Sequence, residues 1–154
     1  MMDSKVEQFT RFIERYEIAF AGGDFTKVLQ LWSPDCDEPW HQPEEFDEPL
    51  IGWPALEQYA QSLGGVLDSF EVKTTGHRMK PGPADSLLFI LTLHWRGALK
   101  GAAAPIAATV QVSGLLHEHD GELKLLHYME SGPAALPFVR KAYARQAREG
   151  VWAP

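Results

Sequence analysis

The stretch Arg11–Asp35, RFIERYEIAFAGGDFTKVLQLWSPD, decides how the chain begins to fold. Between residues 6 and 20, apolar residues recur every three or four positions: Val6, Phe9, Phe12, Ile13, Tyr16 and Phe20. This spacing places them on one face of an α-helix. Ser4, followed by Glu7 three residues later, predicts the start of that helix through a capping box. The AGGD motif at 21–24 predicts its end.

Two shorter helices are expected next. Asp24 predicts the cap of a helix through FTKVLQLW, residues 25–32. A third helix is expected over residues 54–62, because Pro54 is tolerated in a first helical turn and two glycines follow at 64 and 65. The N-terminal part of the chain is therefore predicted to hold three helices.

From residue 69 the pattern changes to strands. Four long, β-branched or alternating runs cover residues 70–79, 86–99, 106–119 and 122–130. Asp120-Gly121 between the last two predicts a tight hairpin, and residues 133–148 have the spacing of another amphipathic helix. We therefore predict a single α+β domain over residues 1–154, a cone in which three N-terminal helices cover a curved antiparallel sheet and a C-terminal helix follows.

Composition narrows the class of protein. The formal net charge is −7, which disfavours binding to nucleic acid. The lone cysteine, Cys36, cannot form a disulfide within the chain. The longest apolar run is far shorter than a membrane span, and the N-terminus does not resemble a signal peptide. We expect a cytoplasmic protein that binds neither nucleic acid nor membrane.

The segment between the second and third helices has an unusual composition. PDCDEPWHQPEEFDEPLIGWP, residues 34–54, holds five prolines and seven acids but neither lysine nor arginine. Proline prevents a long helix or a central strand, so the segment is expected to be a shaped loop. Because loops on a rigid scaffold often carry sites, we predict that it forms the rim of a pocket with Trp40, His41 and Trp53.

The chain resembles the nuclear-transport-factor-2-like superfamily, and within it the SnoaL-like and ketosteroid-isomerase-like small proteins. The matching stretches are RFIERYEIAFAGGDFTKVLQLWSPD, WHQP, IGWPALEQY and DGELKLLHYMES, while the strands between 70 and 119 match by pattern only. The resemblance implies a cone-shaped α+β fold. It leaves the activity open, because members include isomerases, dehydratases, cyclases, epoxide hydrolases and binding-only proteins.

Three positions acquire candidate roles from this resemblance. Tyr16 has the spacing to Asp24 at which ketosteroid isomerases place the phenol that binds their oxyanion. Gln42 stands where relatives often carry the acid that serves as general base, so His41 is the nearest group able to accept a proton. The second acid of the isomerase oxyanion hole aligns near Leu115, so steroid isomerisation is not implied.

The candidate catalytic residues are therefore His41, Glu130 and Tyr16, each with a structural alternative. His41 is either a general acid/base or a loop histidine bonded to a carboxylate. Glu130 is either a proton-transfer group whose pKa is raised by apolar neighbours or the partner of Arg96 or His94. Tyr16 is either an oxyanion donor or a core residue.

Candidate substrate-binding residues come from the aromatic surface and from the strands. They are Trp32, Trp40, Trp53, Leu126, Tyr128, His94, Arg96, Gln111 and Leu115. Leu126, Tyr128 and Glu130 are expected on the pocket side of the last strand. The residues 86–99 leave open whether Thr92, His94 and Arg96 or their apolar neighbours face inward.

The choice of which alternate residues of the strand 106–119 face inward leads to a prediction about assembly. Alignment with the last strand favours the odd-numbered residues inward, which would turn Val110, Val112 and Leu116 outward. An apolar outer face is normally covered by another subunit, so we predict a homodimer through this face.

Two classes of function remain. The first is an acid/base enzyme without cofactor, a lyase, dehydratase or isomerase acting on a bulky small molecule that we expect to be aromatic. The second is a non-catalytic small-molecule-binding or dimeric scaffold of the same fold. No zinc, phosphate-loop or dinucleotide motif occurs in the sequence, so we expect neither a metal nor an organic cofactor.

Overall fold

The computed structural model describes residues 2–132. Its helices are α1 (Met2–Phe20), the 3₁₀ helix η1 (Phe25–Leu31) and α2 (Trp53–Val66). Its strands are β1 (Trp40–Gln42), β2 (Leu50–Ile51), β3 (Leu67–Pro81), β4 (Leu87–Leu99), β5 (Ile106–His119) and β6 (Glu122–Ser131). The three predicted helices are present, and the predicted C-terminal helix lies outside the described residues.

The helix boundaries follow local chemistry, with two corrections. Gly22 and Gly23 have positive φ after α1, and the Asp24 carboxylate accepts the backbone N–H of Thr26 at the start of η1. The predicted capping box is wrong, because α1 already begins at Met2 and Ser4 lies within it. The third helix is longer than predicted, since it continues through both glycines to Val66.

The sheet has six strands in the order β2-β1-β6-β5-β4-β3. The four long strands form the predicted antiparallel meander, with a hairpin at Asp120-Gly121 where both residues have positive φ. The expectation of a purely antiparallel sheet is wrong, because β1 runs parallel to β6. The proline-rich segment supplies this strand by folding back beside the last strand of the meander.

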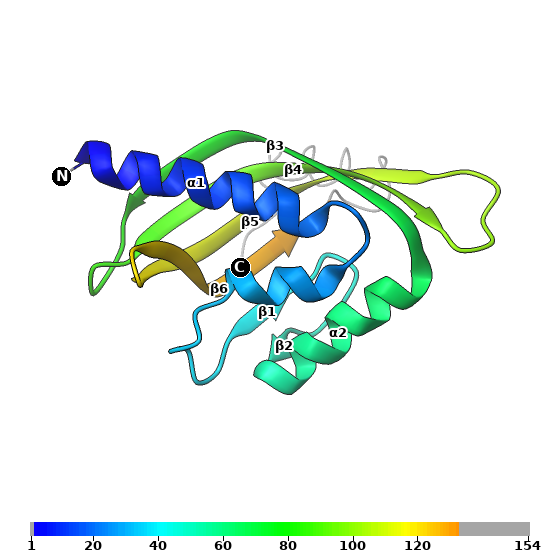
Figure 1. Ribbon diagram of the computed structural model, residues 1–154, viewed down its shortest axis with the longest axis horizontal. Coiled ribbons are helices and arrows are strands. Elements are labelled where there is room, and N and C mark those ends of the chain that lie inside the picture. Colours follow the sequence, from blue (N-terminus) through cyan, green and yellow to red (C-terminus); the bar gives the residue numbers. More distant parts are fainter. Residues whose placement is uncertain (1, 133–154) are drawn as a thin grey trace, which may run out of the picture.

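The long strands curve around α1, which lies across the concave face of the sheet (Figure 1). Their inward residues form the core with the apolar face of α1: Leu87, Phe89, Leu91, Leu93, Val110, Val112, Leu116, Phe9, Phe12 and Tyr16. Helix α2 also lies on the concave side, near the start of β3 (Figure 1). Within residues 2–132, no helix combines the length and the apolar character that crossing a bilayer requires.

Candidate functional site

Strand β1 carries His41 into the interior. Strand alternation turns neighbouring side chains to opposite faces, so Trp40 is 49% exposed while His41 is 6% exposed. His41 pairs with Tyr128 of β6 on one side and with Leu50 of β2 on the other. The histidine is thus fixed by two strands rather than held on a free loop.

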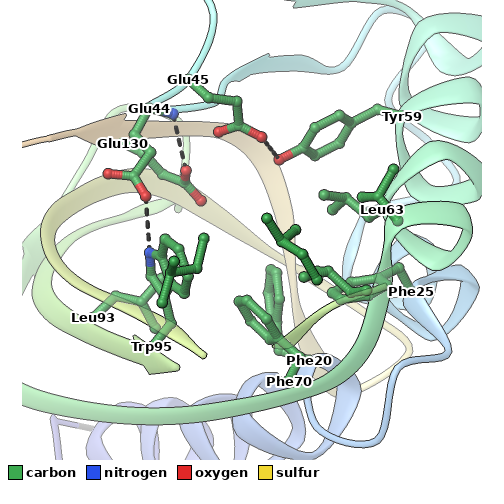
Figure 2. Close-up of a pocket in the computed structure, with 14 residues that line it drawn as sticks. Phe20, Phe25, Glu44, Glu45, Tyr59, Leu63, Phe70, Leu93, Trp95 and Glu130 are labelled. Carbon is green, nitrogen blue, oxygen red and sulfur yellow. Dashed lines mark hydrogen bonds between the residues drawn. The ribbon is translucent and has the colours of Figure 1, made fainter. Parts of the chain in front are cut away.

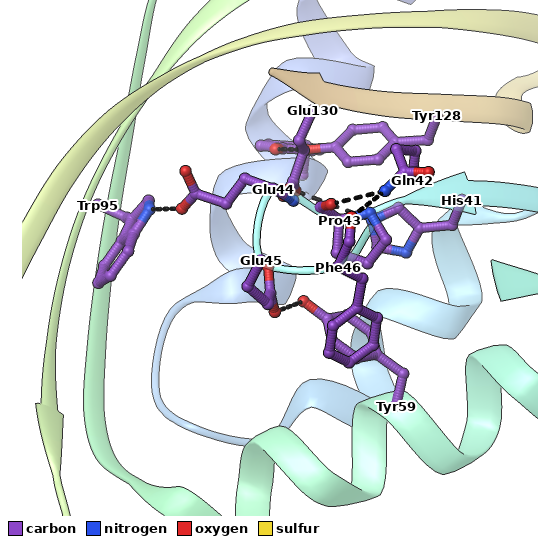
Figure 3. A network of polar contacts seen from close by, with 11 residues as sticks. His41, Gln42, Pro43, Glu44, Glu45, Phe46, Tyr59, Trp95, Tyr128 and Glu130 are labelled. Atoms are coloured by element: carbon purple, nitrogen blue, oxygen red, sulfur yellow. Dashed lines mark hydrogen bonds and ion pairs between the residues drawn. The ribbon is translucent and has the colours of Figure 1, made fainter. Parts of the chain in front are cut away.

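The His41 ring is surrounded by aromatic rings and faces one carboxylate. The ring centroids of Tyr128, Tyr59 and Trp32 lie 5.0, 5.4 and 6.2 Å away. His41 Nε2 lies 3.9 Å from Glu130 Oε1, and the two side chains are 7% and 9% exposed. Nε2 has no hydrogen-bond partner among the described residues. The pair is therefore buried and close, yet not directly hydrogen-bonded (Figure 3).

The loop after β1 places two further acids beside Glu130. The backbone N–H of Glu44 donates to Glu130 Oε2 at 3.1 Å, and the Trp95 indole donates to Glu44 Oε1 at 2.8 Å. The Tyr59 hydroxyl donates to Glu45 Oε1 at 2.6 Å. Pro43 before them is fully buried, so the loop is anchored where it crosses the concave side (Figure 3).

These groups line a cavity of about 310 Å³. The rest of its wall is apolar and combines aromatic with aliphatic side chains: Phe20, Phe25, Leu63, Val66, Leu67, Phe70, Leu93, Trp95, Leu99 and Ile106. The three carboxylates gather on one side, and the rings of Phe20, Phe25 and Phe70 lie on the other (Figure 2). The cavity can hold a hydrophobic molecule with its polar groups turned toward the acids.

Tyr16 and Tyr128 form a buried pair beside this cavity. Their hydroxyls are hydrogen-bonded to each other. Burial raises the pKa of both phenols well above its ordinary value, and the charge of Glu130 adds to the increase. Neither tyrosine lines the cavity. The hydroxyl that does belong to its wall is that of Tyr59, whose pKa is also raised by burial and then by Glu130 and Glu45.

The three tryptophans of the N-terminal region do not line this cavity. Trp32 is buried and borders a recess of about 20 Å³ next to His41. The Trp53 indole donates to the carbonyl of Cys36 at 2.9 Å, and that of Trp40 donates to Glu38 at 3.0 Å. The proline-rich segment does form part of the rim, as predicted, but through Glu44 and Glu45 rather than through Trp40 and Trp53.

The prediction that the odd-numbered residues of β5 face inward is wrong. Val110, Val112 and Leu116 are 1%, 2% and 0% exposed in the core, whereas Gln111 is exposed and Leu115 half-buried on the opposite face. Of the two alternatives for β4, the apolar one is right, because Leu91 and Leu93 are buried while His94 and Arg96 are exposed. On the outer face His94 bonds Thr75 and Thr109.

A β-bulge at Leu126 explains the error. Near the hairpin Leu116 pairs with Leu125, but the next pair joins Leu115 to His127, so Leu126 is an extra residue in β6. One extra residue moves every later side chain to the other face. Tyr128 and Glu130 do face inward as predicted, opposite Gly114 and Val112, but Leu126 does not line the cavity.

The correction removes the basis of the predicted dimer. Val110, Val112 and Leu116 are covered by the chain's own helices, so they cannot form an outer apolar interface. The homodimer stays a prediction, without this support.

Sequence reasoning missed most of the cavity wall. Glu44 and Glu45 had a signal, since they belong to an acidic segment without a basic residue. Phe20, Phe25, Phe70 and Tyr59 come from four separate elements, and only the packing of those elements brings them together. Glu130, from the predicted catalytic set, does lie in this wall, while His41 lies directly behind it.

No protein-family model matches the chain, and no curated protein matches its sequence significantly. Solved structures do match its shape. A candidate dehydratase of the NTF2-like family from Streptomyces avermitilis is 18% identical, with a TM-score of 0.72, and the match covers 86% of this chain and 99% of that one. A candidate scytalone dehydratase from Novosphingobium aromaticivorans is 10% identical, with a TM-score of 0.74 and coverage of 87% and 89%.

A type 2 hexachlorocyclohexane dehydrochlorinase is also similar, at 14% identity and a TM-score of 0.67, with 86% of this chain and 90% of that chain covered. At such identities the likeness concerns the fold. The helices, the curved open sheet and these matches together show that the chain has the nuclear-transport-factor-2-like fold.

Proposed function

We propose that the cavity is the active site of a proton-transfer enzyme of the lyase or dehydratase type, acting on a bulky hydrophobic small molecule. One observation carries the proposal. Glu130 is a carboxylate in the wall of an apolar cavity, with the buried, unpartnered Nε2 of His41 at 3.9 Å from it. Paired titratable groups in a concave, water-poor site are typical of acid/base catalysis.

Glu130 is the group that would exchange a proton with the substrate, because it lies in the cavity wall whereas His41 lies behind it. Its carboxylate takes a proton from a carbon next to the one that bears a hydroxyl. The C–H electron pair forms the double bond, the C–O bond breaks, and Glu130 returns the proton to the departing oxygen, which leaves as water. Atoms and charges balance without a further reactant. Return of the proton to another carbon would instead give an isomerisation.

Two other groups would support this step. Tyr59 keeps its proton, since its pKa is raised. Its single O–H donates to Glu45 in the structure and would turn from Glu45 to a substrate oxygen that gains negative charge. His41 is a positioning residue, which lies 3.9 Å from the Glu130 carboxylate and would hold it in place. Dehydratases and a dehydrochlorinase among the structural matches, all of them named for eliminations, support this class of reaction.

The test is a panel of hydroxylated aromatic and alicyclic compounds incubated with the protein in D₂O. Mass spectrometry would follow loss of water and uptake of deuterium. Glu130→Gln keeps the size of the side chain and its acceptor for the Glu44 N–H, and should lower turnover by about 10²–10⁴-fold. Glu48→Gln, which removes the same charge from an exposed position in the loop between β1 and β2, outside the cavity wall, is the control.

His41→Gln tests the positioning role. It should lower kcat with little change in KM, because it removes the ring beside the Glu130 carboxylate without altering a residue of the cavity wall, and a thermal melt checks that the variant is folded. If Glu130→Gln keeps wild-type turnover on a substrate found by the panel, the proposed function is wrong. Binding of panel compounds without turnover by the wild type would favour the non-catalytic alternative.

A further inference from the structure

The acids of the cavity have no basic counterpart. Glu44, Glu45 and Glu130 lie in its wall, and no lysine or arginine does among the described residues. None of the ion pairs in residues 2–132 joins these three acids to a lysine or arginine. The nearest basic group is the ring of His41, 3.9 Å from Glu130.

The three acids also repel one another. Burial raises the pKa of Glu44, the Trp95 hydrogen bond opposes this, and the charges of Glu130 and Glu45 raise it further. Like charges held together in a partly desolvated wall destabilise the charged forms. A positive charge in the cavity would relieve this repulsion, whereas a neutral ligand would not.

The remaining wall suits an organic cation. Aromatic faces attract ammonium groups within about 6 Å of the ring centroid, and Trp95, Phe70 and Tyr59 lie in the same wall as the acids. A bare metal ion fits less well, because no three histidine, cysteine, aspartate or glutamate side chains converge as ligands in the described part of the chain. The volume of about 310 Å³ is that of an organic molecule rather than of an ion.

A second feature is a buried polar atom beside the acids. His41 is 6% exposed, and its Nε2 faces the acid cluster without a hydrogen-bond partner. A buried polar atom left unpaired is costly.

We propose that the cavity takes a cationic ligand, an organic ammonium joined to a hydrophobic or aromatic body. The ammonium lies against Glu44 and Glu45, and the body lies against Phe20, Phe25 and Phe70. This assignment of a substrate class rests on the proposed function, in which the same cavity is the active site. It leaves Glu130 free to act on a carbon between the two ends.

The test compares two probes of nearly equal shape. The first is 4-(hydroxymethyl)benzyltrimethylammonium, and the second is 4-neopentylbenzyl alcohol, in which carbon replaces the charged nitrogen. Calorimetric titration of the full chain should give an affinity for the cation about tenfold or more above that for the neutral probe, given the strength of desolvated cation–π contacts. Equal affinities, or tighter binding of the neutral probe, would overturn the proposal.

Three matched variants assign the effect to the cavity. Glu44→Gln and Glu45→Gln should each weaken binding of the cation by several-fold and leave the neutral probe unaffected. Glu48→Gln removes the same charge from the same loop outside the cavity wall and should change neither affinity. If Glu48→Gln weakens the cation as much as the other two do, the attraction comes from the net charge of −7 and the proposal fails.

The outcome is separate from that of the proposed function. Should elimination of neutral compounds depend on Glu130 while the cation binds no better than its isostere, the enzyme assignment stands and the cationic class is wrong. Selective cation binding combined with turnover unaffected by Glu130→Gln would support the cationic class and overturn the enzyme assignment.

Discussion

The two ends of the cone's interior are built from the same helix but differ in their polar groups. At the end reached by the first half of α1, Phe9 and Phe12 pack against Phe89 with ring centroids 5.9 and 5.7 Å apart. At the other end Phe20 faces a cavity whose wall also holds three carboxylates. One end is filled by side chains, while the loop between β1 and β2 places charge at the other. Stability and chemistry are thus expected to depend on different ends.

The largest effect is expected at the packed end. Phe12 is fully buried, so Phe12→Ala removes a core ring and should lower the free energy of unfolding by about 3–5 kcal/mol. Ile18→Ala on the same helix, at a position that is 69% exposed, should stay within about 0.5 kcal/mol of the wild type. Urea denaturation measures both, and similar losses from the two variants would contradict the comparison.

At the end that holds the cavity, removal of a wall group should affect the reaction rate rather than the stability of the fold. Tyr59→Phe removes the hydroxyl that donates to Glu45 from the cavity wall. If that hydroxyl stabilises a developing charge, kcat should fall by about 10²–10³-fold, which corresponds to about 3–4 kcal/mol of barrier. Steady-state kinetics and a thermal melt of the same sample would test this. A melting temperature that falls sharply while kcat is retained would reverse the assignment.

Gly114 sharpens the comparison, because it borders the packed end. A Cβ at this position would lie 2.5 Å from Phe89 Cε1 and 2.7 Å from the carbonyl of His127. Gly114→Ala should therefore destabilise the fold by about 1–3 kcal/mol through overpacking. Gly65→Ala is the control, since a Cβ in α2 there meets nothing within 4 Å and should stabilise the helix by up to about 1 kcal/mol.

The smallest effect concerns the pH dependence of stability. The raised pKa of Glu44 means that the folded protein holds this proton more tightly than the unfolded chain. The free energy of unfolding therefore falls as pH rises from the ordinary value near 4.5 through the raised value. Glu44→Gln should flatten this decline in denaturation curves recorded from pH 4.5 upward. If the slope of the free energy of unfolding against pH is the same in the variant, the charge of Glu44 does not destabilise the folded state.

The sequence predicted the elements well where the signal was local. Helical spacing identified α1, Asp24 identified the cap of η1, and Asp120-Gly121 identified the last hairpin. It was less successful for Ser4, where the helix begins earlier than its cap signal, and for the two glycines at the end of α2. Propensity gives only a small preference, about 1 kcal/mol for a glycine inside a helix, so two glycines do not by themselves end one.

The candidate site was predicted only in part, and Leu126 shows why. Pairing counted from the hairpin would place Gln111 opposite Glu130, but the bulge places Val112 there. A single extra residue has no clear mark in a run such as ELKLLHYME. The same bulge turns both Tyr128 and Glu130 inward. It is also the reason why the even-numbered residues of β5 face inward, and not the odd-numbered ones as predicted.

The sequence by itself determined the order of helices and strands, the acidity of the proline-rich segment and the presence of His41 and Glu130 as candidate proton-transfer groups. These depend on local spacing and on residue chemistry. Only the tertiary structure decided that β1 pairs parallel to β6, that Glu44 and Glu45 join Glu130, and that aromatic rings from α1, η1 and β3 close the wall opposite them (Figure 2). The physical reason is that long-range pairing and the burial of one sheet face are collective, because each strand's register depends on the partner that it packs against.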